Sequence, residues 1–444
     1  MTVNTATDED FQNYLYMLST RGTAFWELYY SDSIMTEGKY EITGEFLEWA
    51  EANYRMLKNS KMIGGKPDVT KLNNFDSNEA QAEAYGFSCF DGTDGIISLR
   101  NPSANADKTI KFTFDRTMGV AEGAGTLNYY LEHSYLLSDK SAQTGTLEYG
   151  KEYSVTLKPN EVRILRVSKE KDTTAPKIDR IMTDGAKELT VKFDEKVSGN
   201  LFKVENAKVS SIKKSADDTT YHIVLAEAPA NEAAVKVIPK DIKDMSGNKA
   251  TEDASVVYHK NNVIVENEKV TEAGQLAEAD KSLNSNNGFT VYATVNTAET
   301  NKSLVKQNDQ YELKVTAEGK ASFTLNGATA VSGKSINDGA EHKVVGVKEN
   351  NGMLKLYVDG TLEGSAYNKE NRFHEVKKAA ITAGEGVTAA AVYDIAYGYN
   401  EVANLGEPEG LPKLKLTNDM ITVSGKSEGA VSYTHLRAHE TSAH

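Results

Sequence analysis

The sequence has little cysteine, no long apolar run and fewer basic than acidic residues. The single cysteine, Cys89, excludes an internal disulfide framework and a cysteine-rich zinc site. No stretch approaches the roughly 18–20 consecutive apolar residues that a membrane helix needs. The 50 Lys and Arg stand against 64 Asp and Glu, a net charge of −14, which disfavours binding to nucleic-acid phosphates. We therefore expect no membrane insertion and no nucleic-acid partner.

The composition fits a folded chain with several domains. Apolar residues make up 39%, and the 33 glycines bring the sequence close to the average of globular proteins. At roughly 150 residues per domain, 444 residues predict about three domains. The first residues, Met1–Glu9, are polar and acidic, whereas a signal peptide has a basic segment followed by an apolar one.

A helix, a strand and a second helix are predicted near the start. Thr7 begins a capped amphipathic helix that ends at Gly22. The apolar and aromatic run over residues 24–31 is typical of a buried parallel strand. Thr43 is a candidate N-cap of the second helix. Because a parallel strand needs neighbouring strands, we expect the protein to begin upstream of this chain.

Beyond Ala84, apolar and polar residues alternate between turn signals, which predicts β-strands. Lys169–Asp172 is interpreted as a charged linker to a second unit of short strands. A third all-β unit begins near Asn261. The first unit is predicted to be an antiparallel sandwich with five strands, Ile96–Leu99, Ile110–Phe114, Thr126–Leu131, Tyr153–Leu157 and Val162–Val167.

Five segments in the first part of the chain carry a resemblance. They are Phe25–Tyr30, Phe46–Trp49, Ile63–Pro67, Ala84–Phe87 and Gly95–Ser103. Together they resemble the end of a glycoside hydrolase (β/α)8 barrel and its C-terminal β-sandwich, of the α-galactosidase-like or endo-α-N-acetylgalactosaminidase-like kind. The resemblance implies that Phe25–Tyr30 is the last barrel strand.

Two further units also resemble known modules. The tract that opens Asp172-Thr-Thr-Ala-Pro176 and closes at Ile242–Asn248 resembles bacterial Ig-like modules. In the third unit, His342–Val347 and Leu354–Gly360 flank an Asn-Gly turn, and a closing strand is expected at Ala390–Tyr399. That unit resembles a laminin-G/concanavalin A-like jelly roll.

The end of the chain differs in character from the rest. Lys413–Glu428 is weakly similar to the start of a discoidin-type carbohydrate-binding module, and Val431–Thr441 resembles a translated sequencing adapter. We predict a mainly β, multidomain chain. The expected parts are a (β/α)8 barrel remnant (1–60), an antiparallel β-sandwich (61–170), an Ig-like sandwich (171–260), a laminin-G-like jelly roll (261–404), a linker with the start of a further module (405–430) and adapter-derived residues (431–444).

The candidate substrate-binding residues are those around the end of the expected barrel strand. Active sites of such barrels lie at the C-terminal ends of the strands. An aromatic ring there could stack on a sugar, but a place in the barrel core is the favoured interpretation. Glu27 and Asp32 are a conceivable carboxylate pair, but in the resembling enzymes the catalytic carboxylates come from earlier strands, so we expect none here. The candidates are Trp26, Glu27, Tyr29, Ser31 and Asp32.

No metal site or cofactor is expected. Asp91–Gly95 and the Asp241–Asn248 segment are interpreted as polar turns rather than cation loops. The histidines lack metal-ligand spacing, and Cys89 is interpreted as a buried thiol. Calcium in the laminin-G-like unit is possible, although no residue pattern in the sequence supports it. The tyrosines of that unit are spread through its strands and form no evident aromatic platform; they are Tyr292, Tyr311, Tyr357, Tyr393, Tyr397 and Tyr399.

The resemblances together imply a function. We expect a non-catalytic C-terminal portion of a secreted or cell-surface bacterial glycoside hydrolase, with an Ig-like spacer and a module that binds glycan or glycoprotein carbohydrate. We expect it to be a monomer. One alternative is a surface adhesin or structural array of β domains. A second is that this chain itself hydrolyses glycosides.

Overall fold

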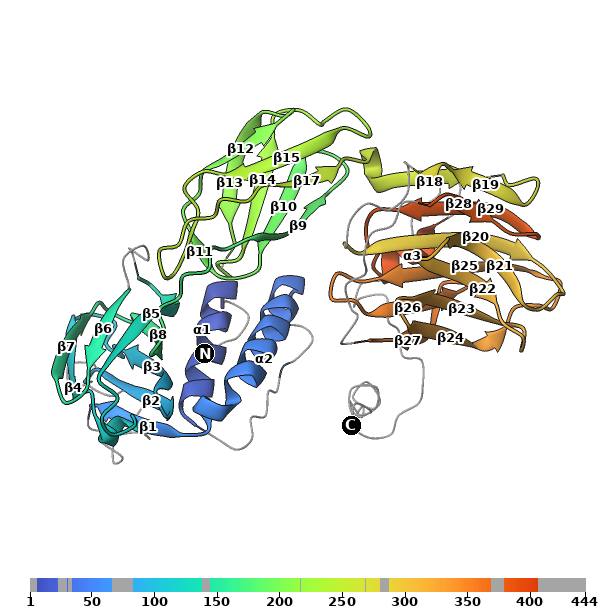
Figure 1. Cartoon of the computed structure of the whole chain (residues 1–444). Helices are drawn as coiled ribbons and strands as arrows, with labels where there is room; N and C mark the ends of the chain where they lie inside the picture. The colour runs from blue at the N-terminus through green and yellow to red at the C-terminus, as the bar shows by residue number, and fades with distance from the viewer. Residues whose placement is uncertain are drawn as a thin grey trace. The chain divides into compact units, whose positions relative to one another are not determined.

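The computed structural model consists of two compact units, Met1–Val263 and Ile264–His444, and each is described by itself. Both are built mainly of antiparallel strands (Figure 1), which confirms the predicted mainly β fold. No helix among the described residues is long and apolar enough to span a membrane. The structure describes residues 6–22, 30, 34–65, 83–137, 144–215, 217–267, 269–279, 287–368 and 379–405.

Two helices open the first unit, α1 (Asp8–Thr20) and α2 (Glu37–Leu57). The hydroxyl of Thr7 accepts the backbone N–H of Asp10, which confirms the predicted cap of α1. The predicted cap of α2 is wrong, because Thr36 rather than Thr43 accepts the backbone N–H of Lys39. Thr43 lies inside the helix and donates its hydroxyl to the Lys39 carbonyl. The predicted strand over residues 24–31 lies, apart from Tyr30, outside the described residues.

The helices are followed by a β-sandwich with a six-stranded sheet, β1-β2-β3-β8-β5-β6, and a two-stranded sheet, β4-β7. All five predicted strands are present, as β3, β4, β5, β7 and β8. The strands are β1 (Ser60–Gly64), β2 (Tyr85–Asp91), β3 (Asp94–Arg100), β4 (Lys108–Thr113), β5 (Thr126–Tyr135), β6 (Thr144–Glu148), β7 (Glu152–Leu157) and β8 (Val162–Ser168), and the 3-10 turn η4 (Arg116–Met118) follows β4.

Both faces of the large sheet are buried. Ile97 and Leu165 point into the sandwich core, whereas their neighbours Ile96 and Ile164 pack against the helices with Leu15. Successive side chains of a strand point to opposite faces. The paired apolar residues of β3 and β8 therefore reflect a sheet that is covered on one face by strands and on the other by α1 and α2.

A second, smaller sandwich completes the first unit. Its sheets have the orders β13-β14-β10-β9, β12-β15-β17 and β11-β16 around a core that includes Val191, Tyr221 and Val237. Its assignment to the Ig-like family stays a prediction. The strands are β9 (Ile178–Thr183), β10 (Glu188–Phe193), β11 (Val197–Ser198), β12 (Phe202–Glu205), β13 (Val209–Lys214), β14 (Thr220–Leu225), β15 (Ala234–Pro239), β16 (Lys243–Asp244) and β17 (Ala254–Val257), followed by the 3-10 turn η5 (Lys260–Asn262).

The second unit packs two six-stranded sheets face to face. One has the order β18-β29-β20-β25-β26-β27 and the other β19-β28-β21-β22-β23-β24. The elements are β18 (Val263–Asn267), β19 (Gly274–Ala277), β20 (Phe289–Asn296), β21 (Lys302–Gln307), β22 (Tyr311–Val315), β23 (Lys320–Leu325), β24 (Ala328–Ser335), β25 (Glu341–Lys348), β26 (Leu354–Val358), β27 (Thr361–Ala366), β28 (Ile381–Ala383), β29 (Val387–Tyr393) and α3 (Tyr399–Asn404).

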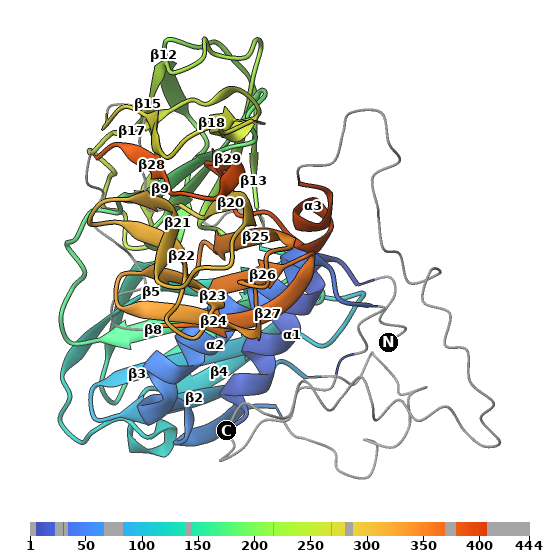
Figure 2. The same ribbon diagram turned by 90° about the vertical axis from the view of Figure 1, so that its right-hand side faces the viewer.

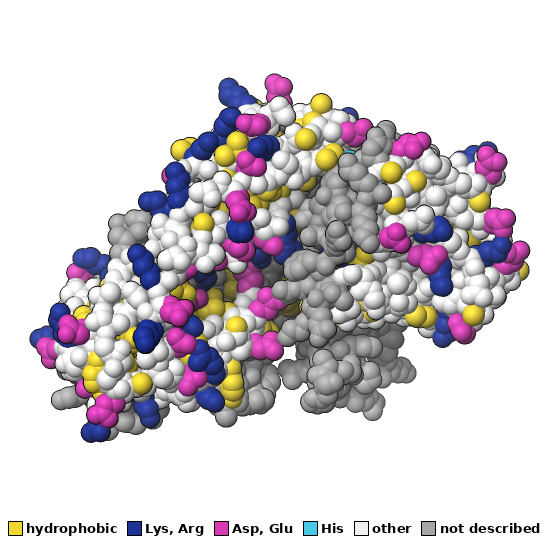
Figure 3. All heavy atoms as spheres, in the orientation of Figure 1, with side chains coloured by type: hydrophobic (Ala, Val, Ile, Leu, Met, Phe, Trp, Pro, Cys, Tyr) yellow, Lys and Arg dark blue, Asp and Glu magenta, His cyan; other side chains and the backbone are white. Residues whose placement is uncertain are grey.

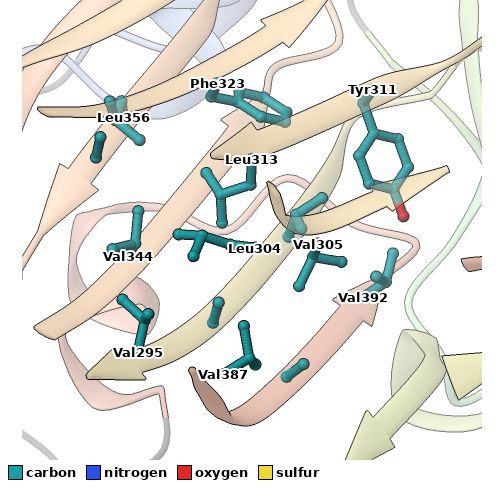
Figure 4. Packing of buried hydrophobic residues seen from close by; sticks show 14 of the residues in the cluster. Val295, Leu304, Val305, Tyr311, Leu313, Phe323, Val344, Leu356, Val387 and Val392 are labelled. Carbon is teal, nitrogen blue, oxygen red and sulfur yellow. The ribbon is translucent and has the colours of Figure 1, made fainter. Parts of the chain in front are cut away.

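The interior of this jelly roll is a single apolar cluster, to which both sheets contribute alternate residues of their strands. Figure 4 shows Val295, Val344 and Leu356 from one sheet facing Leu313 from the other. Gly346 of β25 lies directly under the ring of Phe323, where an added Cβ would sit 2.5 Å from Cγ. The predicted β25–β26 hairpin is confirmed by its antiparallel register. The expected closing strand was placed too late, because β29 ends at Tyr393 and Tyr399 begins α3.

Candidate functional site

The substrate-binding residues predicted from the sequence cannot be placed. Trp26, Glu27, Tyr29, Ser31 and Asp32 all lie outside the described residues, and their role stays a prediction. Their neighbour Tyr30 is described, and its ring packs edge-on against Phe11 at 5.2 Å, within the cluster under the helices. Burial raises the pKa of the Tyr30 hydroxyl to about 12.

Two sequence interpretations concerning chemistry are supported. The Cys89 thiol is fully buried and donates to the Thr20 carbonyl at 3.4 Å, and burial raises its pKa to about 12, so it is a structural thiol. Asp91 and Asp94 flank the β2–β3 turn, and the Arg55 guanidinium binds both carboxylates, at 2.8 Å and 2.5 Å. This pairing fixes the β2–β3 turn to α2.

The helices, the first sandwich and the second sandwich meet around Lys196. Its ammonium donates to the Glu132 carbonyl at 2.8 Å and to the Tyr16 hydroxyl at 3.2 Å, and it lies 4.4 Å from the centre of the Tyr16 ring. The His133 ring stacks on Tyr16, and the Trp49 indole donates to the Glu132 carboxylate at 2.8 Å. The two sandwiches are thus joined through a network of polar contacts.

The predicted linker between these sandwiches, Lys169–Asp172, is therefore hydrogen-bonded to both of them. Asn128 of the first sandwich donates to the Lys169 carbonyl at 3.0 Å, and Asn248 of the second donates to the Asp172 carbonyl at 3.2 Å. Four residues with charged side chains in a row predict a linker, but the backbone carbonyls of this tract accept hydrogen bonds from both neighbouring sandwiches. Sequence patterns do not reveal such contacts.

Three carboxylates converge at the joint between the two sandwiches. Asp172, Glu195 and Asp244 each place a ligand oxygen within 4.8 Å of the others. Asp244 is held in its turn by Asn248, whose backbone and side-chain nitrogens donate at 2.7 Å and 2.8 Å. Burial, with the charges of Asp244 and Asp172, raises the pKa of Glu195 to about 8. Three such oxygens are a donor set that suits a hard cation such as calcium.

The interpretation of Asp244 as a turn residue was incomplete. It does close the turn, but the fold also brings it to Asp172 and Glu195, which come from other loops of the chain. Spacing along the sequence could not have shown this. The laminin-G-like unit, where the sequence left calcium open, has no comparable three-ligand group among the residues that the structure describes.

Of the six tyrosines named above for the second unit, five gather on one face, contrary to the sequence interpretation. Tyr311 alone belongs to the core. Tyr292 and Tyr357 lie in one cross-strand row, each opposite Val345 of β25. Tyr393 of β29 lies opposite Thr290 of β20 on the same outer face. These tyrosines alternate with core residues along their strands, and this parity was the signal that could have identified the face.

The segment after β29 lies across this tyrosine face. The Thr290 hydroxyl donates to the Ile395 carbonyl at 2.8 Å and accepts the Tyr397 N–H at 3.0 Å. Figures 1 and 2 place α3 beside β25. The Tyr397 ring centre lies 5.0 Å from that of Tyr393, and the Tyr399 ring centre 6.4 Å from that of Tyr357. Tyr399 remains 45% exposed.

Tyr399 is therefore an exposed aromatic ring beside a layer of buried tyrosines, Tyr292, Tyr357 and Tyr393. Polar groups surround this layer. The Lys355 ammonium pairs with the Glu349 carboxylate beside Tyr357, and both charges act on the Tyr357 hydroxyl, whose pKa is raised chiefly by burial. An exposed ring with hydrogen-bonding groups beside it can recognise a ligand that has one apolar face and a polar edge.

The comparisons identify the class of this second unit. Residues 270–394 match the family model described as "Concanavalin A-like lectin/glucanases superfamily". This match, together with the two packed sheets, shows a concanavalin A-like domain over residues 270–394 of the second unit. The match covers less than a third of the chain and assigns no family to the first unit. A search of curated proteins found no relative.

Several solved structures are similar at low identity. A putative carbohydrate-binding protein from Bacteroides ovatus is 10% identical, with 71% of this chain and 80% of that one covered at a TM-score of 0.24. The binding domain of Paraclostridial Mosquitocidal Protein 1 is 12% identical, with 53% and 51% covered at 0.26. A Trypanosoma rangeli sialidase is 11% identical, with 73% and 60% covered at 0.25. TM-scores this low define neither fold nor function for this chain.

Proposed function

We propose that the second unit binds carbohydrate, with Tyr399 as the ring that stacks on a sugar. The observation that carries the proposal is the match of residues 270–394 to a family of lectins and glucanases. The exposed Tyr399 ring supplies an apolar platform, and the nearby Lys355–Glu349 pair supplies a donor and an acceptor for hydroxyl groups. The ligand class is a neutral glycan or the carbohydrate of a glycoprotein.

A glycan array probed with the full chain tests this proposal. We expect binding to a restricted set of glycans, and loss of that binding in Tyr399→Ala. Tyr367→Ala is the matched control, because Tyr367 follows β27 and is similarly exposed, at 44%. An array with no bound glycan, or equal losses in the two variants, would contradict the proposal.

We further propose that the chain is the non-catalytic C-terminal portion of a secreted or cell-surface bacterial glycoside hydrolase. The resemblance of residues 1–170 to a barrel end with its sandwich supports this context, and so does a carbohydrate-binding unit on the same chain. Tethering would raise the enzyme's local substrate concentration. The surface adhesin remains the rival. Upstream sequence decides between them, since further β/α repeats favour the hydrolase and further Ig-like repeats favour the adhesin.

The proposed lack of catalysis is tested directly. The purified chain is assayed on aryl glycosides, and we expect no turnover. Measurable hydrolysis that disappears in Glu27→Gln would establish the alternative of an active fragment. Light scattering on the same preparation checks the expected monomer.

A further inference from the structure

A cavity lined largely by residues with polar side chains lies at the joint between the two sandwiches of the first unit. Its volume is about 170 Å³. Its floor is one face of β5, β6 and β8, where cross-strand neighbours present an amide and hydroxyl groups. Asn128 lies between Thr146 and Ser168, and Tyr130 lies opposite Thr144. The floor is therefore rich in groups that both donate and accept hydrogen bonds.

The roof of the cavity is the connecting tract together with one turn of the second sandwich. Glu170, Lys171 and Asp172 line it from the tract, and Ser246 lines it from the turn after β16. A hydrogen bond connects the floor to the roof, because the Ser168 hydroxyl donates to the Glu170 carbonyl at 2.6 Å. The contacts of Asn128 and Asn248 to the same tract fix both sides. The cavity is thus formed before any ligand binds, which reduces the entropic cost of binding.

The size of the cavity suits a single small ring. Pockets for drug-sized molecules start at roughly 300 Å³, so a volume of about 170 Å³ is enough for one pyranose. The half-buried Tyr130 in the floor offers a ring for one apolar face of such a molecule. The hydroxyl and amide groups around it suit a polyhydroxylated ring.

The charge around the cavity selects among such rings. Two carboxylates, Glu170 and Asp172, and one ammonium, Lys171, line the roof. Asp244 places a further carboxylate within 4.8 Å of that of Asp172, whereas the neighbouring Glu195, whose pKa is raised to about 8, is mostly protonated at neutral pH. The surroundings are therefore net negative, which attracts a protonated amine and repels a carboxylate on the ligand.

We propose that this cavity binds a single amino-sugar ring, in preference to a neutral hexose and with exclusion of a uronic acid. The site lies wholly in the first unit, and its residues are distinct from those of the tyrosine face. A single ring held by hydrogen bonds in a preformed pocket should bind with a Kd of about 1–10 mM.

The test is a titration of the full chain with glucosamine, glucose and glucuronate, followed by NMR chemical shifts or calorimetry. We expect saturable binding of glucosamine, weaker binding of glucose and no binding of glucuronate. Ser246→Trp fills the cavity from its roof and should abolish binding. Glu170→Gln removes one carboxylate and should reduce the preference for glucosamine over glucose by about two- to fivefold.

Two comparisons keep the test decisive. Thr146→Val replaces a floor hydroxyl at nearly constant volume and should weaken all binding, whereas Thr126→Val changes an exposed threonine of β5 outside the cavity and should not. If Ser246→Trp fails to fold, Thr146→Val carries the test. Absence of glucosamine binding, equal binding of glucuronate, or binding unchanged in both cavity variants would overturn the proposal. Tyr399→Ala should leave this binding unchanged, which separates it from the lectin proposal.

Discussion

The stability of the first unit should fall with rising pH because of Glu195. Its pKa in the folded chain is raised from 4.5 to about 8, by burial and by the carboxylates of Asp244 and Asp172. Asp194 and Glu132 add like charge, and the ammonium of the adjacent Lys196 is directed to Glu132 and Tyr16. The folded chain therefore holds a proton that the unfolded chain releases. The stabilisation is complete below about pH 4.5 and is lost as the pH rises to about 8.

The magnitude follows from the size of this pKa difference. A difference from 4.5 to about 8 corresponds to at most about 5 kcal/mol. Solvent still reaches part of the side chain, and screening lowers the cost to about 1–3 kcal/mol. Replacement by glutamine keeps the shape and removes the charge. Glu195→Gln should therefore match the wild type near pH 4.5 and exceed it by about 1–3 kcal/mol above pH 8.

The assay is urea unfolding of wild type and Glu195→Gln at pH 5, 7 and 9, with the first unit's transition followed separately. Glu227→Gln is the control, because Glu227 is an exposed glutamate of the same sandwich. A stability difference that does not grow with pH would show that Glu195 is not charged at a cost in the folded chain. A pH dependence of equal size in the control variant would assign it to other groups.

Three further predictions concern packing. Lys196→Met removes the ammonium from Glu132 and Tyr16 and should destabilise the first unit by about 1.5–3 kcal/mol in urea unfolding; unchanged stability would mean that the joint does not depend on this contact. Because its pKa is about 12, Cys89 should react with a thiol reagent at pH 8 only after unfolding, and rapid labelling of the native chain would contradict its burial. Gly346→Ala forces a Cβ against the Phe323 ring and should lower the free energy of unfolding of the second unit by about 1–3 kcal/mol. Gly44→Ala is the control: its Cβ meets open space on α2, so the change should be neutral or stabilising by up to about 1 kcal/mol. Similar unfolding midpoints for the two variants would show that Gly346 is not required.

Local patterns predicted much of the secondary structure. The Thr7 cap, the five strands of the first sandwich and the β25–β26 hairpin depend on neighbouring residues, and each is present. β1, β2 and β6 were not predicted. β2 shows why, because its burial does not alternate cleanly: one face packs on the core and the other on the helices. α2 begins before the predicted cap. Thr36 and Thr43 are both plausible N-caps in the sequence, and only tertiary packing decides between them.

The candidate sites were less accessible to sequence reasoning. The tyrosine face could have been identified from parity, since Tyr292, Tyr357 and Tyr393 alternate with core residues along their strands. The convergence of Asp172, Glu195 and Asp244 and the cavity at the joint depend on contacts between loops that are far apart in the chain. No local pattern encodes those contacts. The predicted substrate residues around Glu27 remain predictions.

We propose that the second unit is a carbohydrate-binding module that contacts its ligand through Tyr399. The most direct measurement is the Kd of the full chain for the strongest array ligand, in wild type, Tyr399→Ala and Tyr367→Ala. Loss of a stacking ring should weaken binding by about tenfold or more, with Tyr367→Ala equal to wild type. Equal affinity in all three proteins would contradict the claim.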